Sequence, residues 1–238
     1  PGEQMFSKDQ KYGFDYYSAH AYINFDRFLK EIVVGDFSAN FANGLTLGYG
    51  MSGKSSLATD IKHNANRLKK YSGSTEFGFF RGVGTTLQFK NLKMILLASQ
   101  KELDAALITD STTGITTITS LPQTGYHRTQ TELNQRKQVK ENIIGSNLQL
   151  KTQALSIGIN SVALKYEHPV AANPDLYRIF EPSSDLFFNT SIDYQFIKQG
   201  ILAWGEIAAD KNKNIALMQG FHFKTSEIAQ FALHIRKY

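Results

Sequence analysis

The feature that most constrains the fold of this chain is an alternation of apolar and polar side chains with a period of two residues, which recurs in several segments. In the segment 188–196 one face carries Phe188, Thr190, Ile192, Tyr194 and Phe196, and the other carries Asn189, Ser191, Asp193 and Gln195. Successive side chains of a strand point to opposite faces, whereas a helix places every third or fourth residue on one face. These segments therefore predict β-strands whose two faces differ in chemistry.

The links between the strands alternate in length. We predict ten strands, near residues 14–25, 29–42, 78–90, 92–107, 138–150, 153–166, 185–197, 200–210, 214–223 and 227–238. Links of a few residues alternate with long links at residues 43–77, 108–137 and 167–184, and only the link at 211–213 breaks this order by being short. One end of the molecule is thus expected to carry short turns and the other end long loops.

This sorting of links is typical of bacterial transmembrane barrels, which have short periplasmic turns and longer outer loops. A tilted strand needs about 9–11 residues to cross a bilayer, whereas strands of soluble domains most often have about 5–6. We therefore predict an all-β fold: an antiparallel, up-and-down transmembrane β-barrel, with residues 1–238 as a single domain whose long outer loops carry short helices. The alternative is a soluble all-β protein in which Phe and Tyr fill an inner core.

The end of the chain predicts that the barrel continues beyond it. Counting back by twos from Tyr238 gives Arg236, His234, Ala232 and Gln230, which form the polar face of the last strand. A final aromatic residue is expected in phase with the apolar face instead. We therefore expect this chain to be a fragment of a barrel of about 12–16 strands, since bacterial barrels have even strand numbers.

The polar faces predict the side chains that line the interior of the barrel. These candidates are Asp36, Asn40, Asn189, Ser191, Asp193, Gln195, Glu206, Gln230, His234 and Arg236. Paired carboxylates in such a set are able to perform acid–base chemistry. Lining of a polar interior accounts for them more simply, so the chain is not expected to be an enzyme.

Two segments depart from regular alternation. In residues 91–100 both faces are apolar, which a plug inside the barrel or packing against a partner would explain. Around Ser161 the apolar phase changes, from Leu155 and Ile157 to Val162 and Leu164. That change predicts a β-bulge.

The stretch GLTLGYGMSGKSS matches the phosphate-binding pattern G-x-x-x-x-G-K-S at Gly48, Gly53, Lys54 and Ser55. A working phosphate loop follows a buried parallel strand, precedes a helix, and belongs to a fold in which strands and helices alternate. The rest of the chain lacks that alternation. We therefore interpret the match as accidental, with glycines that allow a tight bend where a strand leaves the barrel.

Composition excludes several further kinds of site. The chain has no Cys, so it has neither disulfides nor thiolate ligands. Its six His residues, at 20, 63, 127, 168, 222 and 234, lack the spacing of metal ligands, and we predict no metal and no cofactor. The net charge of +5 is spread along the chain, and its densest basic run, at residues 67–70, is interpreted as a solvated loop, with a patch for anionic lipid or nucleic acid as the alternative. In residues 124–138, Thr129 is predicted to cap a short helix with Glu132 at its third position.

Three stretches together resemble a known family: EIVVGDFSANFANGLTLGYGMSGKSS, FFRGVGTTLQFKN and LPQTGYHRTQTELNQRK. They are similar to the barrel region of Bacteroidetes outer-membrane proteins that are often described as helix-hairpin-helix domain proteins. The matching residues are 35–37 with 44–45, 53–55, 79–82 and 124–129. The resemblance implies an outer-membrane barrel in which G-K-S belongs to a loop. The helix-hairpin-helix part is missing here, so no role on DNA is implied for this segment.

We therefore expect a non-enzymatic protein of the bacterial outer membrane that acts as a porin-like pore, a transport component or a scaffold. Its expected partners are membrane lipid and other outer-membrane or periplasmic proteins, and no small-molecule substrate is assigned. A soluble β-rich binding protein is the first alternative, and a nucleotide-binding protein that uses Lys54 and Ser55 is a distant one.

Overall fold

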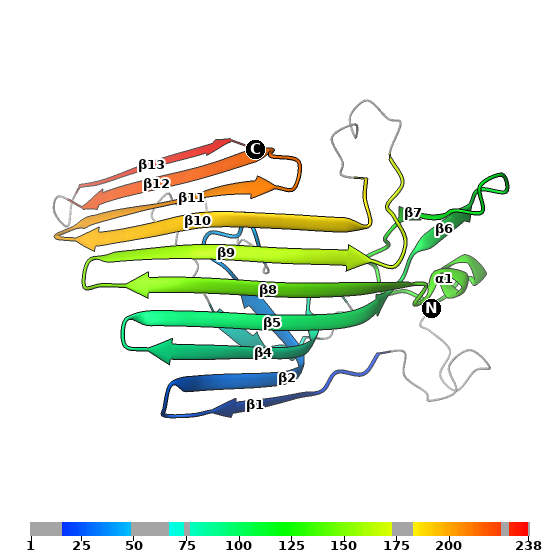
Figure 1. The fold of residues 1–238 in the computed structure, drawn as a ribbon, viewed down its shortest axis with the longest axis horizontal. Coiled ribbons are helices and arrows are strands. Elements are labelled where there is room, and N and C mark those ends of the chain that lie inside the picture. The colour runs from blue at the N-terminus through cyan, green and yellow to red at the C-terminus, as the bar shows by residue number, and fades with distance from the viewer. Residues whose placement is uncertain (1–15, 49–66, 74–76, 173–182, 225–228, 238) are drawn as a thin grey trace.

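The computed structural model describes residues 16–48, 67–73, 77–172, 183–224 and 229–237. Ten strands form one antiparallel meander in which each strand pairs with the next (Figure 1). They are β1 (His20–Asn24), β2 (Leu29–Asn40), β4 (Phe80–Phe89), β5 (Leu92–Leu103), β8 (Val139–Lys151), β9 (Leu155–Tyr166), β10 (Leu186–Lys198), β11 (Ile201–Asp210), β12 (Ile215–Lys224) and β13 (Gln230–Lys237). The prediction of ten strands in up-and-down, antiparallel order is confirmed.

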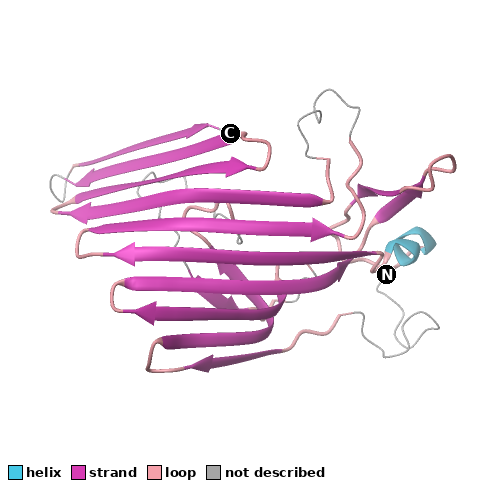
Figure 2. Cartoon of the chain, viewed as in Figure 1, coloured by secondary structure: helices cyan, strands magenta, loops and turns pink. Residues whose placement is uncertain are grey.

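The remaining elements lie in the long links. β3 (Arg67–Lys70) pairs with the second half of β2, while β6 (Ala106–Thr109) and β7 (Thr116–Ser120) form a separate hairpin. The helix α1 (Gln130–Gln135) precedes β8. Figure 2 shows that α1 and the β6–β7 hairpin lie at one end of the sheet, opposite the short turns. We call these two ends the loop end and the turn end.

The outer face of the sheet is apolar across its width. Cross-strand partners on this face form a continuous row from β2 to β12. The row consists of Leu29, Leu87, Met94, Leu148, Ile159, Ile192, Ile207 and Leu217. Its members from β8 to β12 are exposed, with Ile159 51% and Ile192 56% accessible, whereas Leu29, Leu87 and Met94 are half-buried. The alternation in the sequence thus corresponds to one apolar face that no described residue covers.

The inner face is covered by the chain itself. Beyond Gly35 the strand β2 bends over this face and continues with the turn at residues 41–47, behind β5, β8 and β9 in Figure 1. A core cluster results from β2, β3, β4, β5, β8 and β9. It contains Val33, Phe37, Ala39, Phe41, Leu68, Phe80, Ile95, Leu97, Ile143 and Val162.

This inner core explains both irregular segments. Within residues 91–100, Ile95 and Leu97 belong to the core, while Leu96 is exposed on the outer face. The predicted bulge at Ser161 is wrong, because β9 keeps an unbroken register with β8 and β10. The apolar phase changes there because Ile159 faces outward and Val162 packs inside.

The sheet is open within the described residues. β1 pairs only with β2, and β13 pairs only with β12, so these strands are its two edges. No helix in the described part of the chain is long and apolar enough to cross a bilayer.

Candidate functional site

The inner face of β8, β9, β10 and β11 carries a buried chain of hydrogen bonds. The Asn147 amide donates to Asn160 Oδ1 over 2.7 Å. The Asn160 amide donates to Ser191 Oγ over 3.0 Å and to Asp193 Oδ2 over 2.9 Å. The Ser191 hydroxyl donates to Glu206 Oε1 over 2.7 Å. All five side chains are at most 2% exposed. These hydrogen bonds replace much of the water that the polar groups lose on folding, although Asn147 Oδ1 has no partner among the described residues.

Glu206 joins this network to the turn that follows β2. Its Oε2 accepts the backbone N–H of Asn43 over 2.9 Å and that of Leu45 over 3.3 Å. Phe41, the first residue of this turn, packs so closely that a Cβ added to Gly145 would lie 3.2 Å from its ring. The turn is therefore held inside the sheet by a carboxyl acceptor on β11 and by close packing on β8. We call residues 41–47 the inner turn.

Most of the predicted interior residues share this inner face. The register places Asp193 opposite Glu206, and Gln195 opposite the buried Trp204. Asn189 pairs with Val162, which belongs to the inner core. Ser191 belongs to the hydrogen-bond chain described above.

The predicted interior residues of β13 lie toward the edge of the same face. The ring of His234 lies tilted against that of Trp204, with ring centres 5.3 Å apart, and Arg236 is the cross-strand partner of Met218. Gln230 is the register partner of Lys224.

Asp36 and Asn40 differ from the prediction, because they lie on the other face of β2. Asp36 pairs with Arg81, one residue away from the inward pair Gly35 and Gly82. The apolar face of β2 turns inward to form the core, so its polar face turns away from the inner network. Apolar side chains of a barrel strand are expected to point outward. This rule fails on β2, because the second half of the strand packs against other strands of the same sheet.

Asp36 and Arg81 form a paired charge at the loop end. Asp36 is 1% exposed, and its two oxygens accept from Arg81 Nε over 2.7 Å and from Nη2 over 2.9 Å. Such a two-point contact is the strong geometry for arginine and a carboxylate. Arg81 Nη2 also donates to the carbonyl oxygen of Tyr17 over 2.9 Å, and the guanidinium lies 5.3 Å from the Phe79 ring centre.

Two glycines allow the strands to approach at this pair. Gly35 has φ of 96°, a conformation that side chains disfavour. A Cβ on Gly35 would lie 2.2 Å from the carbonyl oxygen of Ala19, and one on Gly82 would lie 2.2 Å from that of Ala98. The stretches GDF and FFRG in the sequence are therefore direct partners in the sheet: Gly35 with Gly82, Asp36 with Arg81, and Phe37 with Phe80.

The long link between β5 and β8 is also anchored by polar contacts. His127, 5% exposed, lies with Nε2 2.8 Å from Asp104 Oδ2, and Asp104 Oδ1 accepts the backbone N–H of Lys137 over 2.9 Å. Thr129 caps α1, and the side chain of Glu132 returns to the backbone N–H groups of Arg128 and Thr129. The predicted capping of this helix is confirmed.

These contacts fix the charge state of Glu132. Hydrogen bonds from the Arg128 backbone first, and from the Thr129 backbone second, hold the pKa of the Glu132 carboxyl below its ordinary value. The carboxyl is therefore ionised at neutral pH and is stabilised in that form by the first turn of the helix.

The phosphate-loop match falls mostly outside the described residues, which include Gly48 but not Gly53, Lys54 or Ser55. The described part that precedes it forms an antiparallel bridge between Phe41 and Leu47. A phosphate loop follows a parallel strand instead. The described geometry therefore gives no support to nucleotide binding.

The two asparagines at the centre of the inner network were not singled out in the sequence. Both Asn147 and Asn160 are fully buried. Asn147 sits between Gly145 and Gln149 on a face opposite to Ile144 and Leu148, so alternation in β8 was the signal that could have identified it. Arg81, Lys101 and Glu141 carried no comparable signal, because their ion pairs join strands that are distant in sequence.

No group of three or more potential metal ligands occurs among the residues described. The arrangement offers buried polar groups that are engaged with one another and with the inner turn, which is the chemistry of a structural network. Comparisons with protein-family models, with curated proteins and with solved structures found no match.

Proposed function

We propose that this chain forms the membrane-spanning part of a bacterial outer-membrane β-barrel protein, and that the barrel is a non-enzymatic scaffold with its interior filled by its own chain. The observation that carries the proposal is the outer row of eight apolar side chains beside an inner row that is mostly polar. The inner row consists of Glu31, Thr86, Ile95, Asn147, Asn160, Ser191, Ala208 and Ala216. Such a pair of faces suits a barrel that has lipid outside and a polar interior.

The size of the apolar face supports lipid as its neighbour. From β4 to β12 the sheet has seven strands, hence six spacings of about 4.8 Å, or about 29 Å of width. Alternate residues from Phe188 to Phe196 extend the face over eight residue steps, or about 26 Å. The product, roughly 750 Å², exceeds the largest apolar patch of typical soluble monomers, about 300–600 Å².

The filled interior favours a scaffold over an open pore. Phe37, Phe41 and Ile95 pack together inside the sheet, and Glu206 holds the inner turn across from them. A pore would need that space for water. The proposal also requires that the free edges of β1 and β13 become paired in the membrane, since lipid offers no hydrogen-bond partners for the backbone.

Membership of the Bacteroidetes barrel family is part of the proposal. Its support here is that two of the resembling stretches, around Asp36 and around Arg81, meet as paired strands. A third stretch contains His127 and Thr129, which anchor the loop between β5 and β8. Stretches that are far apart in sequence thus lie at the loop end of the same sheet.

Two lysine substitutions on the outer face test whether lipid covers it. Ile192 lies in the middle of β10 and is 56% exposed, whereas Ile215 is the first residue of β12 and is 59% exposed. In a bilayer, Ile192→Lys should lower the free energy of unfolding by about 2–4 kcal/mol and Ile215→Lys by about 0–1 kcal/mol, because the cost depends on depth. Denaturant unfolding of the vesicle-bound protein measures both.

A soluble domain predicts a different outcome. Both isoleucines are then exposed to water to the same extent, and both substitutions should change the free energy of unfolding by less than about 0.5 kcal/mol. That result, with protein that refolds in the absence of lipid or detergent, would replace the membrane proposal by that of a soluble β-rich binding protein.

A further inference from the structure

The turn end of the sheet carries a cation on each hairpin. These are Arg27 between β1 and β2, Lys90 between β4 and β5, Lys151 at the end of β8, Lys198 at the end of β10 and Lys224 at the end of β12. All five side chains are exposed. We call these five residues the basic rim.

Few acidic groups accompany the cations of the basic rim among the residues that the structure describes. In the described part of the chain, Asp26 is the one carboxylate at these hairpin tips, and no ion pair joins any of the five cations to an acid. The loop end, in contrast, mixes both signs. Its acidic residues include Asp104, Asp110, Glu132, Glu167, Asp185 and Asp210.

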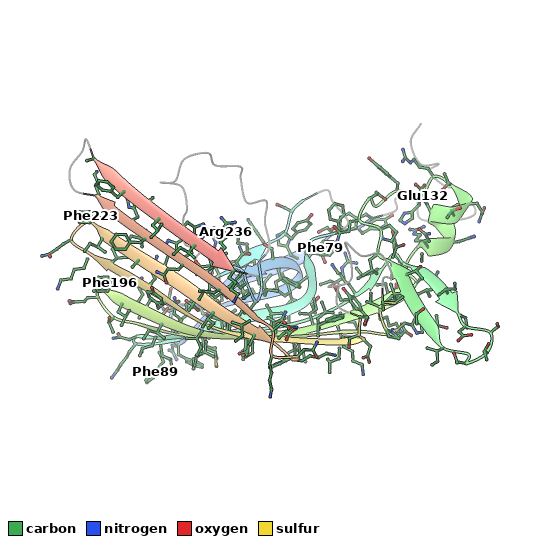
Figure 3. The ribbon with its side chains drawn as sticks, turned by 90° about the horizontal axis from the view of Figure 1, so that it is seen from above. Phe79, Phe89, Glu132, Phe196, Phe223 and Arg236 are labelled. Carbon is green, nitrogen blue, oxygen red and sulfur yellow. The ribbon has the colours of Figure 1, made fainter. Side chains whose placement is uncertain are left out.

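Large apolar side chains adjoin the cations of the basic rim. Phe28, 63% exposed, follows Arg27, and Phe89, 68% exposed, precedes Lys90. Figure 3 shows Phe89, Phe196 and Phe223 gathered at the end of the molecule opposite Glu132. From the middle of the sheet to the hairpin tips, the chain therefore presents first the apolar band, then a belt of aromatic side chains, and finally the cations. This order matches the passage from acyl chains to headgroups at a membrane surface.

We propose that the basic rim binds the phosphates of anionic phospholipid headgroups in the leaflet that the turn end reaches. This inference rests on the proposed function and adds the class of lipid. Neighbouring hairpin tips are two strand spacings apart, or about 10 Å, so the cations follow the edge of the apolar band. A lipid satisfies both features at once, since its chains cover the band and its phosphate meets the cation. A polyanion in water would leave the band uncovered.

The test uses the full chain folded into vesicles of phosphatidylcholine, alone or with phosphatidylglycerol admixed. The rim variant combines Lys90→Gln, Lys151→Gln, Lys198→Gln and Lys224→Gln. The control combines Lys140→Gln, Lys165→Gln, Lys213→Gln and Lys237→Gln, which removes the same charge from the loop end. The ratio of folded to unfolded protein is measured in each vesicle by denaturant titration.

The wild type and the control should favour the anionic vesicles by more than about tenfold, since each lysine near such a surface contributes about fivefold. The rim variant should lose most of this preference, and salt should weaken it in the wild type. Equal stability of the wild type in both vesicles, or an equal loss in the control, would overturn the inference while leaving the barrel intact. Failure of every variant to insert into either vesicle would overturn the barrel as well.

Discussion

At the scale of single residues, Glu206 connects two parts of the interior. Its carboxylate is 2% exposed and accepts hydrogen bonds from the Ser191 hydroxyl and from two backbone N–H groups of the inner turn. Three hydrogen bonds to one buried carboxyl group offset part of the cost of removing it from water. Glu206 is therefore the polar anchor of the inner turn, beside the packing of Phe41.

Replacing Glu206 tests that dependence. Glu206→Ala should lower the free energy of unfolding by about 2–4 kcal/mol, because three donors lose their acceptor. Glu206→Gln keeps one carbonyl oxygen and should lose less. Fluorescence of Trp204, the single tryptophan, which is 3% exposed, follows unfolding in detergent.

The matched control is Glu102→Ala, because Glu102 is an exposed glutamate on another strand of the same sheet, β5. This substitution should change the free energy of unfolding by less than about 0.5 kcal/mol. If Glu206→Ala changed the free energy of unfolding as little as Glu102→Ala does, the role of Glu206 in stabilising the inner turn would be contradicted.

At the scale of elements, the sequence predicted the strands well because their signal is local. Alternation, with turns between, identified all ten strands of the meander, and most lie within a few residues of the predicted ends, whereas β1 begins at His20 and not near residue 14. The short strands β3, β6 and β7 lie inside long links and were missed. Each has at most five residues, which is too few for a periodic pattern.

The course of β2 depends on non-local packing and was not predictable from its own residues. The prediction that Asp36 and Asn40 line the interior implies that the opposite face, with Val33 and Phe37, points outward, but that face forms the inner core. The apolar residues on both faces of the 91–100 segment were the accessible sign of that packing, since Ile95 and Leu97 contact this core. Asp36 was misplaced for the same reason.

The helix α1 gives a prediction about pH. The pKa of Glu132 is lowered in the folded state, so the stability that it gives to the helix is present above its unfolded pKa of about 4.3. That stability is lost as the pH falls through the lower folded value. Amide exchange in α1 should therefore accelerate at low pH beyond the intrinsic pH effect.

Glu132→Gln serves as the control for this pH effect. Glutamine keeps the capping geometry at the third helical position but does not titrate, so protection of α1 should no longer depend on pH. Identical pH profiles for the wild type and Glu132→Gln would contradict the role of the ionised carboxyl.

At the scale of the whole molecule, the two faces of the sheet have opposite neighbours. The outer face is apolar and uncovered from β2 to β12, whereas the inner face holds a polar network and the inner turn. The long loops lie at one end of the sheet and the short turns at the other, so the two ends differ (Figure 2). An outer-membrane barrel with a filled interior accounts for the faces and the ends together.

The most direct measurement compares the gel mobility of boiled and unboiled protein after fractionation of the cell envelope. A closed membrane barrel resists detergent until it is heated, because every strand is paired with its neighbours. The account predicts that the protein is in the outer-membrane fraction and that its mobility changes on boiling. Protein in the soluble fraction, with the same mobility before and after boiling, would contradict it.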